Sequence, residues 1–289
     1  MQEHPWDEWK TEIINTINSI ELINDPFHYF YIEPFLPAEL YKMLDIFWPS
    51  SNCFWGQDEI SYTPLHHKEA NLRKVVIIDD TPELSSTEEG KLFWSKFRDL
   101  IRQPILSKVF IARTEAYIKS VRKDIIDTPI KYFSNALLED DTIGFELGPH
   151  IDSEKNLLSL LLYLPDANAP ENMGTCVYKP NTQFCIDNPS IGYQFNGEYF
   201  KETDFELTYR APYRANALFG LINDPRAYHG VKKIENNLFR RRHIQWTITQ
   251  ENTSPYPSIL SRIKNGVTPE SQRVERRLQE LLNKKRQKI

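Results

Sequence analysis

The stretch Gly144-Phe145-Glu146-Leu147-Gly148-Pro149-His150-Ile151-Asp152 lies in the second half of a chain of 289 residues, among short apolar runs. In a β-strand, residues i and i+2 point to the same side, so His150 and Asp152 can present an imidazole and a carboxylate to one space. Such a pair supplies two of the three ligands of a 2-His-1-carboxylate iron site, which leaves three coordination positions open. Taken alone, a His-x-Asp spacing also arises by chance or as a surface hydrogen-bonded pair.

Short β-like runs surround this stretch. Pro, Asn, Asp and Gly separate them, and many short strands in sequence favour a barrel or a sandwich. The expected strands are 130–138, 143–147, 157–164, 175–178, 205–209, 217–222 and 244–249. The polar and aromatic segment 180–204 interrupts them and is expected to be an insertion, which could cover a small pocket or dock another chain.

The rest of the chain has helical spacing. Helices are expected at 6–20, 37–47, 87–101 and 103–120, with one aromatic strand at 26–32. A last helix from 268 is cationic, with seven Lys or Arg and three Glu over 270–289. It is expected to pack on the domain with a solvated basic end, and recruitment to nucleic acid or anionic lipid is the alternative. We therefore expect one domain over 1–289, with a mainly helical N-terminal region 1–129, a β core 130–250 and a tail 251–289.

The composition narrows the chemistry. A formal net charge of -5 argues against nucleic-acid binding by the whole domain, which would need a basic surface. No apolar run approaches the roughly 20 residues of a membrane span, and no secretory signal is expected at the N-terminus, so we expect a cytoplasmic protein. Cys53, Cys176 and Cys185 are odd in number and lack CxxC spacing, which disfavours a disulfide framework and a cysteine zinc site.

A second histidine and an arginine follow the first motif. His229 comes after the apolar run 217–222 and a turn, and Arg241 enters an aromatic, β-branched run twelve residues later. A charged arginine that points inward needs an anionic partner, and a bound carboxylate matches its bidentate fork. These positions strengthen the interpretation of His150 and Asp152 as metal ligands.

Strand alternation indicates which arginine of the run points inward. Ile244, Trp246 and Ile248 form the more apolar face, suited to packing under helices. Arg241 and His243 then share the opposite face, toward a polar cavity. Arg240 is the alternative if a bulge shifts the register.

Together these motifs resemble the Fe(II)- and 2-oxoglutarate-dependent oxygenases, in the prolyl-hydroxylase-like and phytanoyl-hydroxylase-like branch. The resemblance covers about residues 130–250, and its motifs occur in the same order as in that branch. They read Pro149-His150-Ile151-Asp152, Leu161-Leu162-Tyr163-Leu164-Pro165 and Asn216-Ala217-Leu218-Phe219, with Asp25-Pro26-Phe27-His28 and Phe35-Leu36-Pro37 nearer the N-terminus. The implied fold is mainly β with flanking α-helices: a double-stranded β-helix (jelly-roll, cupin-like) core with a helical N-terminal support and a C-terminal helix.

The resemblance also implies roles for single residues. The implied ligands are His150, Asp152 and His229 for Fe(II), and Arg241, Tyr163 and His243 for 2-oxoglutarate. His243 departs from the pattern, because many members have Ser or Thr two residues after the arginine. The second contact to the co-substrate therefore stays open, with an N–H of His243 as one candidate.

The implied activity is a dioxygenase reaction. With O2, it would oxidise an unactivated C–H bond of a small molecule by hydroxylation, desaturation or oxidative cyclisation, with release of succinate and CO2. The substrate stays unidentified, with amino-acid-like, carbohydrate and anionic molecules as open candidates, and the oligomeric state is open. Two alternatives remain: a protein or peptide hydroxylase of the same superfamily, and a catalytically silent cupin-like binding module.

Candidate substrate contacts follow from the strand before the metal motif and from scattered cations. Tyr132 and Asn135 lie on that strand, on opposite faces. Arg113 and Lys155 are candidate anion contacts, although most such cations are simply exposed. Two other cations and a second metal site are minor alternatives: Arg210, Arg214 and the group His66, His67 and Glu69.

Overall fold

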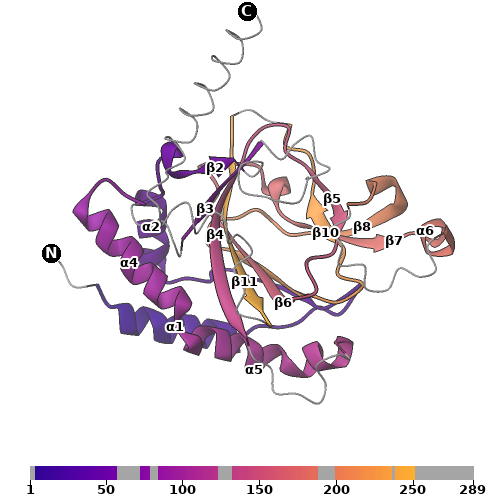
Figure 1. The fold of residues 1–289 in the computed structure, drawn as a ribbon, viewed down its shortest axis with the longest axis horizontal. Coiled ribbons are helices and arrows are strands. Elements are labelled where there is room, and N and C mark those ends of the chain that lie inside the picture. The colour runs from indigo at the N-terminus through magenta and orange to yellow at the C-terminus, as the bar shows by residue number, and fades with distance from the viewer. Residues whose placement is uncertain are drawn as a thin grey trace, which may run out of the picture.

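The chain forms two antiparallel β-sheets in a computed structural model that describes residues 4–56, 72–78, 84–122, 132–187, 199–235 and 238–250. In pairing order, the strands of the larger sheet are β1 (Tyr29–Ile32), β9 (Leu218–Ile222), β6 (Asn156–Tyr163), β11 (Arg241–Thr249), β4 (Phe133–Asp141), β3 (Arg73–Ile77) and β2 (Trp55–Gly56). Those of the smaller sheet are β5 (Leu147–His150), β10 (His229–Val231), β7 (Cys176–Pro180) and β8 (Phe205–Arg210). Figure 1 shows the smaller sheet facing one side of the larger one.

The strand order is that of a jelly roll. From β4 onward the chain passes between the sheets, with β4, β6, β9 and β11 in the larger sheet and β5, β7, β8 and β10 in the smaller one. Each strand of one sheet is thus followed, directly or after one hairpin, by a strand of the other. The predicted fold class, mainly β with a double-stranded β-helix core and flanking helices, is confirmed.

Helices cover the outer face of the larger sheet (Figure 1). The helices on this face are α1 (Trp6–Asn18), α2 (Ala38–Ile46), α4 (Glu88–Arg102) and α5 (Pro104–Val121). A further helix, α6 (Thr182–Asp187), packs Phe184 beside the smaller sheet, and the short 3-10 turns are η1 (Ser51–Cys53), η4 (Glu171–Met173) and η5 (Glu202–Asp204). The first four match the helices expected from the sequence. Within the described ranges, none has both the length and the apolar surface that a bilayer crossing needs.

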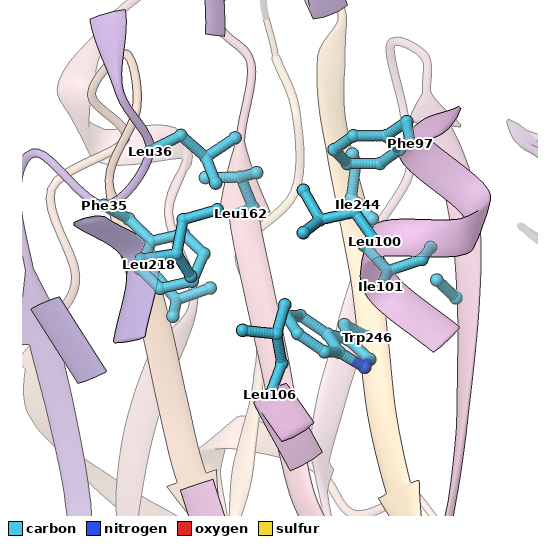
Figure 2. A pocket seen from close by; sticks show the side chains of 12 residues that line it. Phe35, Leu36, Phe97, Leu100, Ile101, Leu106, Leu162, Leu218, Ile244 and Trp246 are labelled. Atoms are coloured by element: carbon cyan, nitrogen blue, oxygen red, sulfur yellow. The ribbon is translucent and has the colours of Figure 1, made fainter. Parts of the chain in front are cut away.

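The two faces of the larger sheet differ as the alternation predicts. Leu162, Ile244 and Trp246 point to the helices, where they meet Phe97 and Leu106 (Figure 2). A cavity of about 20 Å³ remains among these apolar side chains. Residues at the alternate positions of the same strands face the smaller sheet, where they combine apolar side chains such as Leu161 with polar ones such as Ser159 and Arg241.

Several expected elements differ from the observed ones. The run 143–147 is mostly a turn, because Gly144 has a positive φ of 87° and the Phe145 N–H donates to the Thr142 carbonyl, so the strand begins only at Leu147. The short strands β2, β3 and β10 were not expected. The expected insertion 180–204 contains α6 and η5, whereas the expected tail helix lies outside the described residues.

Candidate metal centre and anion cavity

Two neighbouring strands of the smaller sheet bring two histidines together. β10 pairs with β5 so that His229 lies directly opposite His150. Their ring centroids are 4.4 Å apart. The strands crowd closely here, since a Cβ atom at Gly230 of β10 would clash with the Leu147 carbonyl of β5. The register of two short strands therefore places side by side two side chains that are far apart in the sequence.

Asp152 completes the group from the turn after β5. One of its carboxylate oxygens lies 3.8 Å from Nε2 of His150 and 3.7 Å from Nε2 of His229. The three candidate ligand atoms all lie within 4.8 Å of one another. Since metal–ligand bonds to His and Asp are about 2.0–2.2 Å, two donors to one ion are at most about 4.4 Å apart, so both His–Asp distances fit a single ion.

The two histidines direct nitrogen lone pairs to the space between the three candidate ligand atoms. Nδ1 of His150 lies 3.0 Å from the Gly148 carbonyl and Nδ1 of His229 lies 2.9 Å from the Ala227 carbonyl. A carbonyl can only accept, so each Nδ1 carries the hydrogen and each Nε2 is left free to bind a metal. Burial, and then the neighbouring His229, lower the pKa of His150 to about 3, which keeps this ring neutral at physiological pH.

Asp152 is held as an anion and in a fixed position. Burial opposes its ionisation, but the two histidines and a hydrogen bond from the Ser159 hydroxyl outweigh burial and lower its pKa. The buried Asn223 side chain donates to the backbone carbonyls of Ser153 at 2.8 Å and of Asn156 at 3.1 Å, which fixes the turn. The donor set, two imidazole nitrogens and one carboxylate, suits a divalent transition metal such as Fe(II).

The three side chains line a cavity of about 150 Å³ between the sheets. Arg241 and His243 of β11 line it too, as strand alternation predicts. Both side chains are fully buried, whereas those of Arg240 and Arg242 are 45% and 15% exposed and pair with other carboxylates. Arg241 is therefore the arginine of this run that faces the cavity.

Arg241 keeps donors available in the cavity. Its Nε donates to the Met173 carbonyl at 2.7 Å, Nη1 to Asp141 at 2.8 Å and Nη2 to the Thr175 hydroxyl at 3.3 Å. Nη1 also lies 3.3 Å from Nδ1 of His243, so these contacts use four of the five N–H groups of a guanidinium. Arg241 can thus still donate to a ligand carboxylate, as the expected co-substrate requires.

Thr175 is a second donor that the sequence did not indicate. Its hydroxyl oxygen accepts from Tyr163 at 2.8 Å and from Arg241, so its own hydrogen is left to donate, and the residue lines the cavity. Tyr163 in turn accepts from the Thr175 backbone N–H at 3.0 Å. Tyr163, a predicted co-substrate contact, therefore orients Thr175 through its hydroxyl.

Arg73 and Glu139 also line the cavity, and together with Asp141, Arg241 and His243 they form its anion-binding wall. Arg73 donates to Asp141 through Nε at 2.6 Å and through Nη2 at 3.0 Å, and its Nη1 lies 2.8 Å from Glu139. Glu139 lies 2.9 Å from Nε2 of His243. His243, predicted to contact the co-substrate, thus lies beside a buried carboxylate, and burial and Arg241 hold its pKa well below the usual range.

The predicted substrate contacts are spread over the molecule, and two need correction. Tyr132 packs against the helical core, and Arg113 on α5 donates to the Ile20 carbonyl at 2.5 Å and 3.0 Å, so both lie on the helix-covered side of the larger sheet rather than in the cavity. Lys155 is exposed in the turn after Asp152. Asn135 shares the inner face of β4 with Glu139 and stays a candidate.

The two other candidate anion contacts, Arg210 and Arg214, do not line the cavity. Arg210 donates to the Asn172 carbonyl, and Arg214 pairs with Glu171. The second candidate metal site, His66, His67 and Glu69, lies outside the described residues.

Several lining residues had too little signal in the sequence. Arg73 and Tyr199 lie next to segments without clear periodicity, and Tyr199 packs its ring 4.7 Å from that of His150. Glu139 and Asp141 come directly after the expected strand 130–138, at positions that continue the alternation of Asn135 and Leu137. Extending that strand by three residues would have found both carboxylates.

Comparison with known proteins gives structural likeness only. No protein family and no curated protein matches the sequence. The fold is similar to that of a prolyl hydroxylase from Trichoplax adhaerens in complex with a hypoxia inducible factor peptide, at 13% identity over 86% of this chain and 94% of that chain, with a TM-score of 0.46. A Pseudomonas putida prolyl-4-hydroxylase is similar at 10% identity over 83% of this chain and 99% of that chain, with a TM-score of 0.45. HygX from Streptomyces hygroscopicus, with nickel and 2-oxoglutarate bound, is similar at 10% identity over 78% of this chain and 84% of that chain, with a TM-score of 0.44.

Proposed function

We propose that this protein is an Fe(II)- and 2-oxoglutarate-dependent oxygenase that oxidises a C–H bond of a small molecule. The observation that carries the proposal is the convergence of His150, Asp152 and His229 on one point, in a cavity that also contains the inward arginine Arg241. Three protein ligands on one side of an ion leave other positions open for co-substrate and O2. When bound together, iron and 2-oxoglutarate supply an oxidant from O2 with release of succinate and CO2.

The protein's own residues have separable tasks in this proposal. The two histidines and Asp152 hold the metal, and Ser159 and Asn223 keep the carboxylate aimed at it. Arg241 and the Thr175 hydroxyl hold the distal carboxylate of the co-substrate by charge-assisted hydrogen bonds.

A small molecule is the proposed substrate because the cavity is narrow. Its volume is about 150 Å³, and the Tyr199 ring packs against His150 on its lining. A peptide hydroxylase would need room for an extended backbone beside the metal. A substrate screen should therefore compare a panel of small metabolites with a panel of peptides.

Succinate formation tests the proposal. Purified protein with Fe(II) and 2-oxoglutarate in air should form succinate slowly without substrate, and faster when a member of a metabolite panel is accepted. Asp152→Ala should lower this rate at least about 100-fold, because the metal loses its charged ligand. Glu206→Gln, at an exposed position of β8, should leave the rate unchanged.

Two results would contradict the proposal. Metal binding without any succinate, across both the metabolite and the peptide panels, would favour the silent binding module. A rate that Asp152→Ala leaves intact would place the chemistry elsewhere. Stimulation by peptides alone would retain the oxygenase and remove the small-molecule assignment.

A further inference from the structure

The anion-binding wall of the cavity contains an internally balanced charge cluster. Arg73 from β3, Glu139 and Asp141 from β4 and Arg241 from β11 are each at most 7% exposed. Two guanidinium groups therefore oppose two carboxylates. His243, the fifth member, is fully buried between Glu139 and Arg241 and is neutral. A buried cluster of this kind is stable because its charges cancel.

A bound dicarboxylate would upset this balance. Its metal-side carboxylate offsets the ion, but its distal carboxylate adds a third negative charge beside two arginines. A charge buried without a partner is strongly unfavourable. The cluster itself must therefore change its charge by one unit when such a ligand binds.

The position of the compensating charge follows from the contacts. Asp141 accepts three hydrogen bonds from two guanidinium groups, at 2.6, 3.0 and 2.8 Å, so donors already occupy both of its carboxylate oxygens. Glu139 has a weaker set of partners, one guanidinium nitrogen of Arg73 at 2.8 Å and Nε2 of His243 at 2.9 Å. A proton from solvent can be held between Glu139 and His243, on either atom of that short contact.

We infer that a dicarboxylate co-substrate enters this cavity together with one proton, which the Glu139–His243 pair takes up. The inference rests on the proposed function, because it concerns the same ligand at the same site. No bond other than to this proton is made or broken, and the proton comes from bulk water.

The surroundings of the pair support this assignment. The groups that face it are Arg73 from β3, Asp141 from β4, Arg241 from β11, Tyr163 opposite His243 on β6, and Asp152 and Tyr199 across the cavity. Burial raises the pKa of Glu139 against the pull of Arg73 and Arg241, and burial and Arg241 lower that of His243. Neither group is strongly committed to its charged form, so one added ligand charge can decide the protonation state. Among the described residues, no hydrogen bond or ion pair joins either group to the three metal-site side chains.

Calorimetry counts the proton directly. The Mn(II)-loaded full chain is titrated with 2-oxoglutarate at pH 6.5, 7.5 and 8.5, each in two buffers with different ionisation enthalpies. The wild type should take up about one proton per ligand, and its Kd should rise by up to about tenfold per pH unit, because a proton bound with the ligand is harder to obtain at higher pH. Glu139→Gln should bind without proton uptake, since the variant cluster already carries one positive charge. Glu206→Gln, the matched surface control, should keep the wild-type proton uptake and the wild-type Kd.

The outcomes separate the two proposals. Binding of 2-oxoglutarate by the wild type with no proton uptake and a Kd independent of pH would overturn the inference and leave the proposed function standing. Absence of binding would overturn both. If Glu139→Gln fails to fold, the wild-type proton count and its pH series still decide.

Discussion

At the scale of single residues, the metal site depends on hydrogen positions as much as on ligand identity. A backbone carbonyl holds the Nδ1 hydrogen of His150 and of His229, so both rings offer Nε2 to the same carboxylate-lined point. The anion wall depends on Asp141 in a similar way. This side chain is fully buried, and it fixes the guanidinium groups of both Arg73 and Arg241.

Removing Asp141 should be costly for stability. Asp141→Ala leaves two buried guanidinium groups short of a partner, and breaking a buried ion pair from one side costs about 3–5 kcal/mol. Urea denaturation followed by circular dichroism measures this loss. Asp45→Ala is the matched control, because Asp45 also pairs with an arginine but is 56% exposed, and such pairs contribute about 0–1 kcal/mol. Equal small losses in the two variants would show that the buried network is not a structural requirement.

At the scale of elements, helix ends and strand register determine where the site forms. Helix α4 begins after Thr87, whose hydroxyl accepts from the Gly90 N–H at 3.1 Å, and it packs Phe93, Trp94 and Phe97 into the helical core. The register of β10 on β5 brings His229 to His150. The start of α4 is visible in the sequence as Thr87-Glu88-Glu89. A three-residue strand such as β10 is too short for hydrophobic periodicity to predict.

The Thr87 cap has a measurable effect. Thr87→Ala should lower the free energy of unfolding by about 1 kcal/mol, within the 0.5–2 kcal/mol span of lost N-caps, because the Gly90 N–H loses its acceptor. Thr87→Ser retains the hydroxyl and should stay close to wild type. The comparison is made by equilibrium denaturation. Equal losses for the Ala and Ser variants would assign the effect to packing rather than to capping.

At the scale of the whole molecule, one sheet separates two environments. Its outer face packs under helices, and its inner face combines apolar residues with the charged wall of the cavity. The sequence predicted this division and the inward Arg241, because alternation along one strand is a local property. It did not predict that Arg73 would meet Glu139 and Asp141, because that contact depends on the pairing of β3 with β4, which are distant in the chain.

The buried neutral histidines make the fold sensitive to acid. His150 and His243 have pKa values lowered by burial, so below about pH 6.5 the unfolded chain binds protons that the metal-free folded protein does not. The free energy of unfolding should therefore fall as the pH drops from 6.5 to 5, by up to about 1.4 kcal/mol per pH unit for each such histidine. His243→Gln should reduce this slope by about one proton. An unchanged slope in that variant would show that His243 is not held neutral in the folded state.

The central claim is that one metal ion and one 2-oxoglutarate bind together between the His150–Asp152–His229 group and Arg241. Anaerobic addition of Fe(II) and then 2-oxoglutarate, followed by visible absorption, tests it most directly, because a metal-to-ligand charge-transfer band requires the co-substrate to be bound to the iron. We predict a weak visible band that saturates at one equivalent of Fe(II) and one of 2-oxoglutarate. His150→Ala should abolish the band. Arg241→Met should require a higher 2-oxoglutarate concentration to reach half of the full band, whereas Arg240→Met should behave like the wild type. Absence of the band in the wild type, or its persistence in His150→Ala, would contradict the claim.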